Sequence, residues 1–320
     1  MRIKELDYLK GVMIILVITF HLVYIEHLYP YAKQVVYTFH MPVFLVISGY
    51  LMNIEKNWRS FLLAISGLAI PYIVMESGYI VMASLLPINE HLDHLNVELF
   101  FIKLLLHPLG PYWYLHSLVL CGMTYYVVFR YFRAKNLNRF ILIGFTFFLY
   151  SHVLGILPFT SSIFLLVGVI LRQCNINFTR FFQSSALAIW AFILIICHKQ
   201  YLNPSTLGGI LIVYLVISCS LLVFKYSHKT VQKTIIYFGK NSLLLYIFSP
   251  IFTILCKVMV SYFTYDKTGV LFLIASLTVC ISGSLCIGYL MDVLRISPLF
   301  FRKKRIMNSV GTHECGSRGF

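Results

Sequence analysis

The chain has 320 residues, of which 59% are hydrophobic and only 12% are charged, and its mean hydropathy is +0.83. Soluble domains carry about 25% charged residues, so this composition excludes an ordinary soluble fold and indicates a polytopic membrane protein. The net charge of +15 requires no nucleic-acid partner, because basic residues accumulate on the cytoplasmic side of membrane proteins, where anionic lipids attract them. We expect membrane lipids as a partner and no nucleic acid.

Hydrophobic runs predict an all-α, polytopic transmembrane helix bundle of about ten spans. Several runs are shorter than the roughly 20 residues that a span requires, so tilted or re-entrant segments remain alternatives. The runs are 10–29, 38–53, 61–86, 112–131, 139–157, 160–171, 181–198, 207–224, 235–260 and 269–291.

Basic residues lie almost entirely on one side of this arrangement when both termini are cytoplasmic. The exceptions among the 26 Lys and Arg residues are Lys33, Lys103, Lys199, Lys257 and Lys267. Basic residues are retained in the cytoplasm, so the distribution favours an even number of spans and two cytoplasmic termini. We expect one membrane domain over residues 1–300 and a basic, disordered cytoplasmic tail over 301–320.

The first hydrophobic run carries an ionisable side chain, His21, near its middle. Such a group is costly inside a bilayer, so it usually has a function. Lys10 precedes His21 by eleven residues. That separation is about three helical turns, or roughly 16 Å, which places both side chains on one helix face. Asp7 lies close to the same stripe, so a line of polar groups leads from water into the membrane.

The second run opens with a histidine and a proline, in the sequence FHMPVF at 39–44. We expect His40 and Pro42 in the first turn of this span, at its outer end, because proline is well tolerated there. Ser48 and Gly49 follow, and small residues permit close helix approach. Packing is the simpler interpretation of this pair, whereas an interfacial and a functional role are equally good interpretations of His40.

These motifs together resemble the integral-membrane acyltransferase family 3, especially its fucose O-acetylase-like branch. The family's opening motif is Arg or Lys, ten intervening residues and His, which Lys10 and His21 match. The resemblance covers about residues 3–292, with one departure, because relatives commonly carry His where this chain has Ser249. Further matches, in chain order, are Arg59 with AIPY at 69–72, WYL at 113–115, and FGKNS at 238–242 with Tyr246.

The resemblance implies transfer of an acyl group, usually acetyl, from cytosolic acyl-CoA to a sugar hydroxyl of a surface polysaccharide or lipid-linked glycan. Acyl-CoA would be a co-substrate, with no permanently bound cofactor and no metal, and the location would be a bacterial-type inner membrane. The attacking hydroxyl needs a base near neutral pH, and imidazole has that character. We therefore expect His21 to be the general base or a transient acyl acceptor. His40 would be a second proton handler or a ligand of the acceptor hydroxyl.

Basic side chains near the cytoplasm suit the CoA phosphates, and we expect Lys10, Arg59 and Lys240 to contact them. The simpler interpretation of Arg59 is an anchor that follows the distribution of basic residues. Trp113 is most simply interpreted as part of an interfacial aromatic belt, with a sugar-stacking platform as the functional alternative. Glu76 suits a structural role as well as a catalytic one. The supporting candidates are Asp7, Ser48, Glu76, Trp113, Asn241, Ser242 and Tyr246.

A transporter or flippase for a glycan or glycolipid is the alternative from another class. The sequence lacks a visible repeat and paired broken helices, which are the usual signs of alternating access, so the enzyme is favoured. The polar stretch 87–98, with Glu90, His91, Asp93 and His94, suits acceptor contacts or a solvated acidic loop equally well.

Overall fold

The structure, a computed structural model, describes residues 3–85 and 90–307. No β-strand occurs among these residues, which confirms the all-α class. The longer helices are α1 (Lys4–Phe20), α3 (Pro30–Leu51), α4 (Trp58–Leu85), α6 (Trp113–Tyr131), α7 (Asn136–Phe148), α8 (Phe159–Gln173), α10 (Ala186–Ile196), α11 (Leu207–Tyr226), α12 (Lys229–Lys240), α13 (Ser242–Leu255) and α14 (Val270–Val293). The shorter ones are α2 (Val23–Leu28), α5 (Val97–Leu105), η1 (Gly110–Tyr112), η2 (Leu149–Val153), α9 (Phe178–Phe181), η3 (Lys199–Tyr201), η4 (Cys256–Phe263) and α15 (Ser297–Phe300).

Five helical segments in the described part of the chain are long and apolar enough to cross a membrane. They are Pro30–Leu51, Trp58–Leu85, Leu207–Tyr226, Ser242–Phe263 and Val270–Val293. The protein is therefore an integral membrane protein by helix length and composition, while the count of ten spans stays a prediction.

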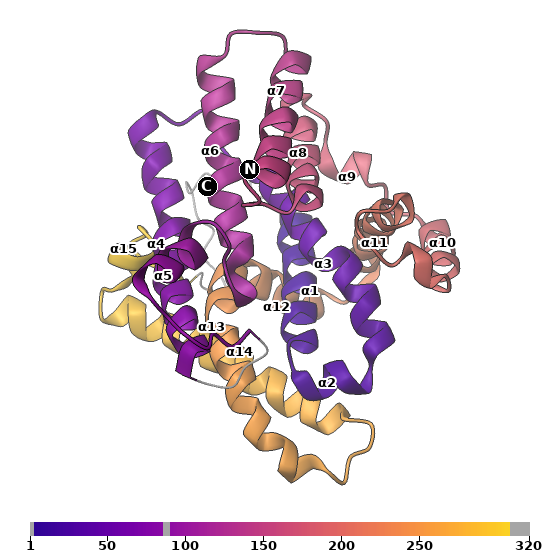
Figure 1. The fold of residues 1–320 in the computed structure, drawn as a ribbon. Helices are drawn as coiled ribbons and strands as arrows, with labels where there is room; N and C mark the ends of the chain where they lie inside the picture. Colours follow the sequence, from indigo (N-terminus) through magenta and orange to yellow (C-terminus); the bar gives the residue numbers. More distant parts are fainter. Residues whose placement is uncertain (1–2, 86–89, 308–320) are drawn as a thin grey trace.

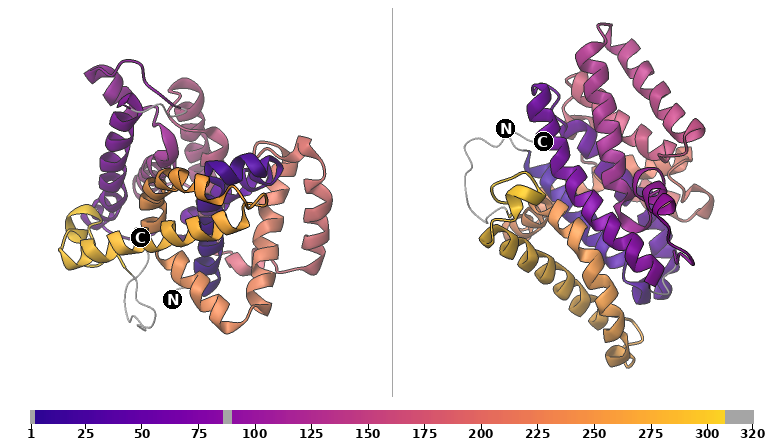
Figure 2. Two further views of the ribbon diagram at one scale, coloured as in Figure 1. Left: turned by 90° about the horizontal axis from the view of Figure 1, so that it is seen from below. Right: turned by 60° about the vertical axis from the view of Figure 1, so that its left-hand side comes forward.

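Helices α1 and α3 form the centre of the bundle, and the other helices surround them (Figure 1). Leu9, Met13 and Ile18 of α1, with Val43 and Ile47 of α3, are fully buried in the main core. Helices α13 and α14 run side by side along one side of the bundle (Figure 2). The exposed apolar side chains of α14 and α10 suit contact with lipid.

Glycines allow two pairs of helices to touch through their backbones. A Cβ added to Gly49 of α3 would overlap the Leu165 carbonyl of α8, and one added to Gly168 would overlap the Val46 carbonyl. Helices α1 and α12 meet in the same way at Gly11 and Gly239. The expected close approach at Gly49 is thus confirmed.

The helix expected to run through His21 is interrupted there. Helix α1 ends at Phe20, His21 caps it, Leu22 is extended, and α2 begins at Val23. The sequence has no Gly or Pro at this point. The Tyr37 hydroxyl instead donates a 3.1 Å hydrogen bond to the Phe20 carbonyl, which the end of the helix leaves unpaired.

The expected position of His40 and Pro42 in a first turn was wrong. Helix α3 begins at Pro30, where proline is favoured at the start of a helix, so His40 and Pro42 both lie in its interior. The single run expected over 235–260 is also divided, because α12 ends at Lys240 and α13 begins at Ser242. Both differences lengthen or redirect helices next to the candidate site.

The described part of the C-terminal segment, 301–307, packs on the bundle. Phe301 and Ile306 are buried, and the Asp292 carboxylate accepts the backbone N–H groups of Ile306 and Met307 at 2.8 and 3.1 Å. The rest of the predicted tail, 308–320, lies outside the described residues.

Candidate active site

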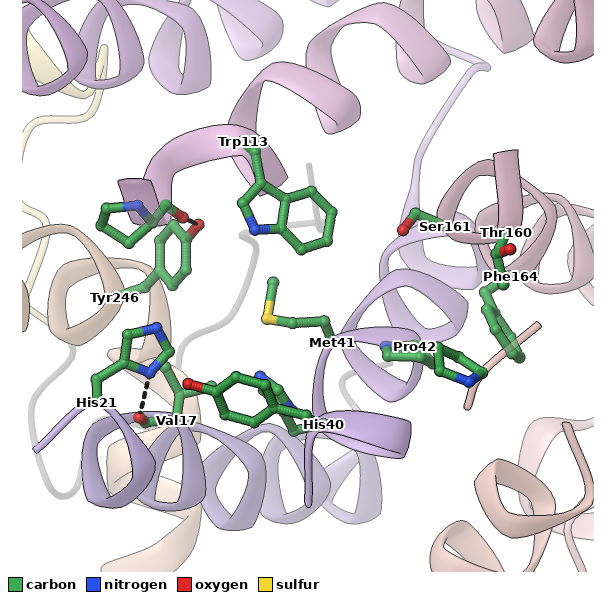
Figure 3. Close-up of a pocket in the computed structure, with 13 residues that line it drawn as sticks. Val17, His21, His40, Met41, Pro42, Trp113, Thr160, Ser161, Phe164 and Tyr246 are labelled. Atoms are coloured by element: carbon green, nitrogen blue, oxygen red, sulfur yellow. Dashed lines mark hydrogen bonds between the residues drawn. The ribbon is translucent and has the colours of Figure 1, made fainter. Parts of the chain in front are cut away.

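A cavity of about 230 Å³ gathers side chains from distant parts of the chain. It lies between the end of α1, the middle of α3, the start of α8, α13 and the loop before α6. Figure 3 shows His21 and Tyr246 on one side, Thr160, Ser161 and Phe164 on the other, and Trp113 facing Met41 between them. The lining residues are Val17, His21, Tyr37, His40, Met41, Pro42, Pro111, Trp113, Thr160, Ser161, Phe164, Pro204 and Tyr246.

Both histidines of the cavity are held in the same way. The Nδ1 atom of His21 lies 2.7 Å from the Val17 carbonyl oxygen, and Nδ1 of His40 lies 2.7 Å from the Val36 carbonyl oxygen. A carbonyl oxygen can only accept, so each Nδ1 carries a hydrogen. In the neutral ring, the lone pair is then on Nε2, which is the nitrogen able to take a proton.

Tyr37 connects the two histidines, and sequence reasoning missed it. Its ring centroid lies 6.0 Å from that of His21 and 5.0 Å from that of His40. Lys33, which forms an ion pair with Glu26, lies over the Tyr37 ring, with its Nζ atom 5.2 Å from the ring centroid. The spacing of Tyr37 and His40, three residues apart on one helix, was the available signal.

Tyrosines organise the wall formed by α13 and the loop before α6. The Tyr246 hydroxyl donates to the Pro111 carbonyl, and the Tyr112 hydroxyl donates to the Ile247 carbonyl at 3.0 Å. The ring of Tyr114 packs against that of Tyr246, with 5.4 Å between the ring centroids. The Tyr114 hydroxyl shares a 2.8 Å hydrogen bond with the Ser48 hydroxyl. Ser48 therefore supports this wall through Tyr114 and does not line the cavity itself.

The predicted donor-side residues form a separate group at the other end of α1. Lys10 makes a 2.8 Å ion pair with the buried Asp7 carboxylate. Gly239 of α12 packs against the Asp7 backbone, which brings Lys240, Asn241 and Ser242 to this end of α1. Asn241 is buried, and its amide donates to the Tyr237 carbonyl at 2.9 Å. None of these side chains lines the cavity.

Two further predicted residues lie outside both groups. Arg59 is exposed in the first turn of α4. Glu76 is fully buried in α4, and its Oε1 accepts the Leu109 N–H at 2.6 Å. In the stretch 87–98, residues 87–89 lie outside the described residues, whereas the Glu90 carboxylate accepts the Gly110 N–H at 2.5 Å.

Ser249, which stands where relatives commonly carry histidine, lies next to the cavity. It is buried and lines a recess of about 10 Å³ with His21, Tyr246 and Thr253. A side chain at this position therefore reaches the surroundings of His21. The hydroxyl of Ser249 cannot replace imidazole as a base near neutral pH, so His21 and His40 are the imidazoles of this cavity.

The described geometry defines an all-helical integral membrane protein with two imidazoles at one cavity and a basic residue, Lys10, nearer the other end of α1. Residues 3–289 match the family described as the acyltransferase domain of acyltransferase family 3. The chain belongs to this family, and it is a membrane acyltransferase. The resemblance inferred from the motifs is therefore confirmed.

A comparison with curated proteins finds similarity to the nodulation protein NolL of Sinorhizobium fredii. The two are 26% identical over 166 residues, which are 49% of this chain and 43% of NolL. The chain thus covers less than half the length of this relative. No solved structure matches the chain.

Proposed function

We propose that this protein transfers an acyl group, most simply acetyl, from acyl-CoA to a sugar hydroxyl of a surface polysaccharide or a lipid-linked glycan. The observation that carries the proposal is the pair of histidines in one cavity, each with Nδ1 bound to a backbone carbonyl. Membership of an acyltransferase family supports the reaction class.

In the proposed reaction, Nε2 of His21 removes the proton of the acceptor hydroxyl. The oxygen attacks the thioester carbonyl, the carbon–sulfur bond breaks, and the proton passes from His21 to the departing CoA thiolate. His40 orients the acceptor hydroxyl or handles a second proton. In a two-step variant, His21 itself accepts the acyl group before the sugar does.

On this proposal, the donor binds at the Lys10 end of α1. Lys10, Lys240 and Arg59 would hold the CoA phosphates, with Asn241 and Ser242 beside the entrance. About 16 Å of helix separates Lys10 from His21, which the extended pantetheine arm would cross. The acceptor would enter from the opposite side, past His40 and Trp113, whose ring suits stacking on a sugar.

The distribution of basic residues supports the membrane orientation that this route requires. It favours cytoplasmic termini and an arrangement of about ten spans, in a bacterial-type inner membrane. Acyl-CoA would then reach Lys10 from the cytoplasm, and the glycan would be reached from outside.

Sealed inside-out vesicles test both the reaction and its sidedness. Acyl-CoA added outside should acylate an acceptor trapped in the lumen and release free CoA in equal amount. Acylation of an impermeant acceptor supplied on the same face as acyl-CoA would contradict the cross-membrane route while keeping the reaction. If the wild-type protein releases no CoA, the transporter or flippase is favoured instead.

The acceptor can be identified by the mass of surface glycans from a deletion strain and its parent. The mass difference identifies the acyl group and the molecule that carries it. Unchanged glycans in the deletion strain would contradict a polysaccharide acceptor.

A further inference from the structure

The segment that joins α5 to the first residue of α6 places two residues in the cavity wall. This segment, Leu109–Trp113, is called the Trp113 loop here, and its Pro111 and Trp113 line the cavity. Gly110 has a positive φ of 57°, in the left-handed region that favours glycine. The Tyr79 ring occupies the space that a Cβ at Gly110 would need. The backbone of the loop therefore has a special conformation beside the site.

Side chains from two directions bind the backbone of the Trp113 loop. From the side of α4, Glu76 accepts the Leu109 N–H at 2.6 Å, and Glu90 accepts the Gly110 N–H at 2.5 Å. From α13, the Tyr246 hydroxyl donates to the Pro111 carbonyl. Three consecutive residues of the loop thus each have one backbone group held by a side chain remote in sequence.

Glu76 is expensive to keep in this position. It is fully buried, and its second carboxyl oxygen, Oε2, has no hydrogen-bond partner in the described structure. A buried polar group without a partner costs about 1–3 kcal/mol, and a carboxylate costs more. Stability alone therefore favours an apolar side chain at this position. What the carboxyl group provides is an acceptor for the Leu109 N–H.

We propose that Glu76 is a positioning residue for the acceptor: by binding the Leu109 N–H it holds the Trp113 loop so that Trp113 and Pro111 form the acceptor wall of the cavity. The inference rests on the proposed function for the identity of the acceptor. Glu76 does not line the cavity, so it acts on the reaction through the loop and not on the reacting atoms. It sets the KM for the acceptor more than kcat.

The test compares Glu76→Ala with Glu76→Gln in the full chain. Glutamine keeps the carbonyl oxygen that accepts the Leu109 N–H, whereas alanine removes it. Ser276→Ala is a matched control, because it removes another buried polar atom without a partner, on α14 and away from the cavity. In a background with Trp58→Phe and Trp190→Phe, Trp113 is the single tryptophan, and acrylamide quenching reports its shielding.

Glu76→Ala should raise the acceptor KM about tenfold or more, because it removes a hydrogen bond to a charged or polarised group, and it should increase quenching of Trp113. Glu76→Gln and Ser276→Ala should keep both properties near wild type. Gly110→Ala, which leaves Glu76 in place, should displace the same loop and reproduce the alanine effect. It also provides the answer where Glu76→Ala fails to fold.

Two results would overturn the inference. In the first, Glu76→Ala or Gly110→Ala leaves both the acceptor KM and Trp113 quenching unchanged. In the second, Glu76→Gln loses turnover as fully as Glu76→Ala while Trp113 stays shielded, which is the behaviour of a reacting acid or base. If the wild-type protein transfers no acyl group, the proposed function fails, and the quenching comparison alone decides whether Glu76 positions Trp113.

Discussion

The two ends of α1 differ in every property that decides what they can bind. At the His21 end, the cavity is lined by imidazoles, hydroxyls, aromatic rings and apolar side chains, and no Lys, Arg, Asp or Glu side chain is among its described lining residues. At the Lys10 end, an ion pair lies beside the basic and amide side chains that follow Gly239. One end suits the uncharged atoms of a reacting ester or sugar, and the other suits the phosphates of a donor.

The comparison predicts that the ends can be disabled separately. Damage at the His21 end should reduce turnover, and damage at the Lys10 end should reduce donor affinity. The variants below are ordered by the size of the expected effect.

His21→Ala should have the largest effect, a loss of turnover that originates at the His21 end of α1. Loss of a general base typically costs about 10²–10⁴-fold in rate, so kcat should fall by that amount while acyl-CoA binding is retained. Steady-state transfer and acyl-CoA binding by the purified protein are the measurements. His27→Ala removes an exposed histidine of α2 and is the control. More than half of wild-type turnover in His21→Ala would remove His21 from the mechanism.

Lys10→Ala should produce the converse result. A charge-assisted phosphate contact contributes about 1.5–3 kcal/mol, so the acyl-CoA KM should rise roughly ten- to hundredfold while the acceptor KM stays constant. Lys10→Arg should be tolerated, because the family motif accepts either cation.

Two measurements make the Lys10 result specific. Lys10→Ala also removes the ion pair of the buried Asp7, so thermal unfolding must show how much folded protein remains. Lys4→Ala removes an exposed lysine from the same helix and should change neither KM. An unchanged acyl-CoA KM in folded Lys10→Ala would contradict the phosphate contact.

Gly239→Ala should test the packing that brings α12 to the Lys10 end. The added methyl overlaps the Asp7 carbonyl, and overpacking of this kind costs about 1–3 kcal/mol of stability. The melting temperature in detergent should fall, and the acyl-CoA KM should rise. Gly78→Ala is the matched control, because nothing lies within 4 Å of its added Cβ. Equal melting temperatures for the two variants would contradict the close contact of α1 with α12.

Tyr37→Phe should have the smallest effect and sharpen the description of the cavity end. It removes the hydrogen bond to the Phe20 carbonyl at the break after α1, which contributes about 0.5–1.5 kcal/mol, so turnover should fall a few-fold. Donor affinity should not change. Tyr24→Phe, on α2, serves as the control for loss of a tyrosine hydroxyl. A Tyr37→Phe variant as inactive as His21→Ala would show that the hydroxyl takes part in the chemistry itself.

The sequence predicted the class of the fold and four lining residues of the cavity, His21, His40, Trp113 and Tyr246. These predictions are confirmed because they rest on composition and on a family's ordered motifs, which can be read from the sequence without knowledge of the fold. The break at His21 was not predictable, since it depends on a hydrogen bond from Tyr37 rather than on a Gly or Pro.

Residues that act across the bundle were also beyond sequence reasoning. Glu76 was visible as a buried carboxyl, but its partner, the Leu109 N–H, is 33 residues away and has no side-chain signature. Lys10 and His21 were expected on one face of one helix, yet the sequence could not show that, of the two, only His21 lines the cavity. Contacts between distant segments decide both cases.

The backbone contact between α3 and α8 has a mechanical consequence for the cavity. With Gly49 and Gly168 each pressed against the opposite main chain, these two helices can neither slide nor rotate past one another without a collision. The wall of the cavity that α3 and α8 form, which includes His40 and Ser161, is therefore rigid. On the proposed function, room for a bulkier acceptor would have to come from the opposite side of the cavity, which the Trp113 loop forms. Acceptor specificity could then be changed there without disturbing His40 of α3.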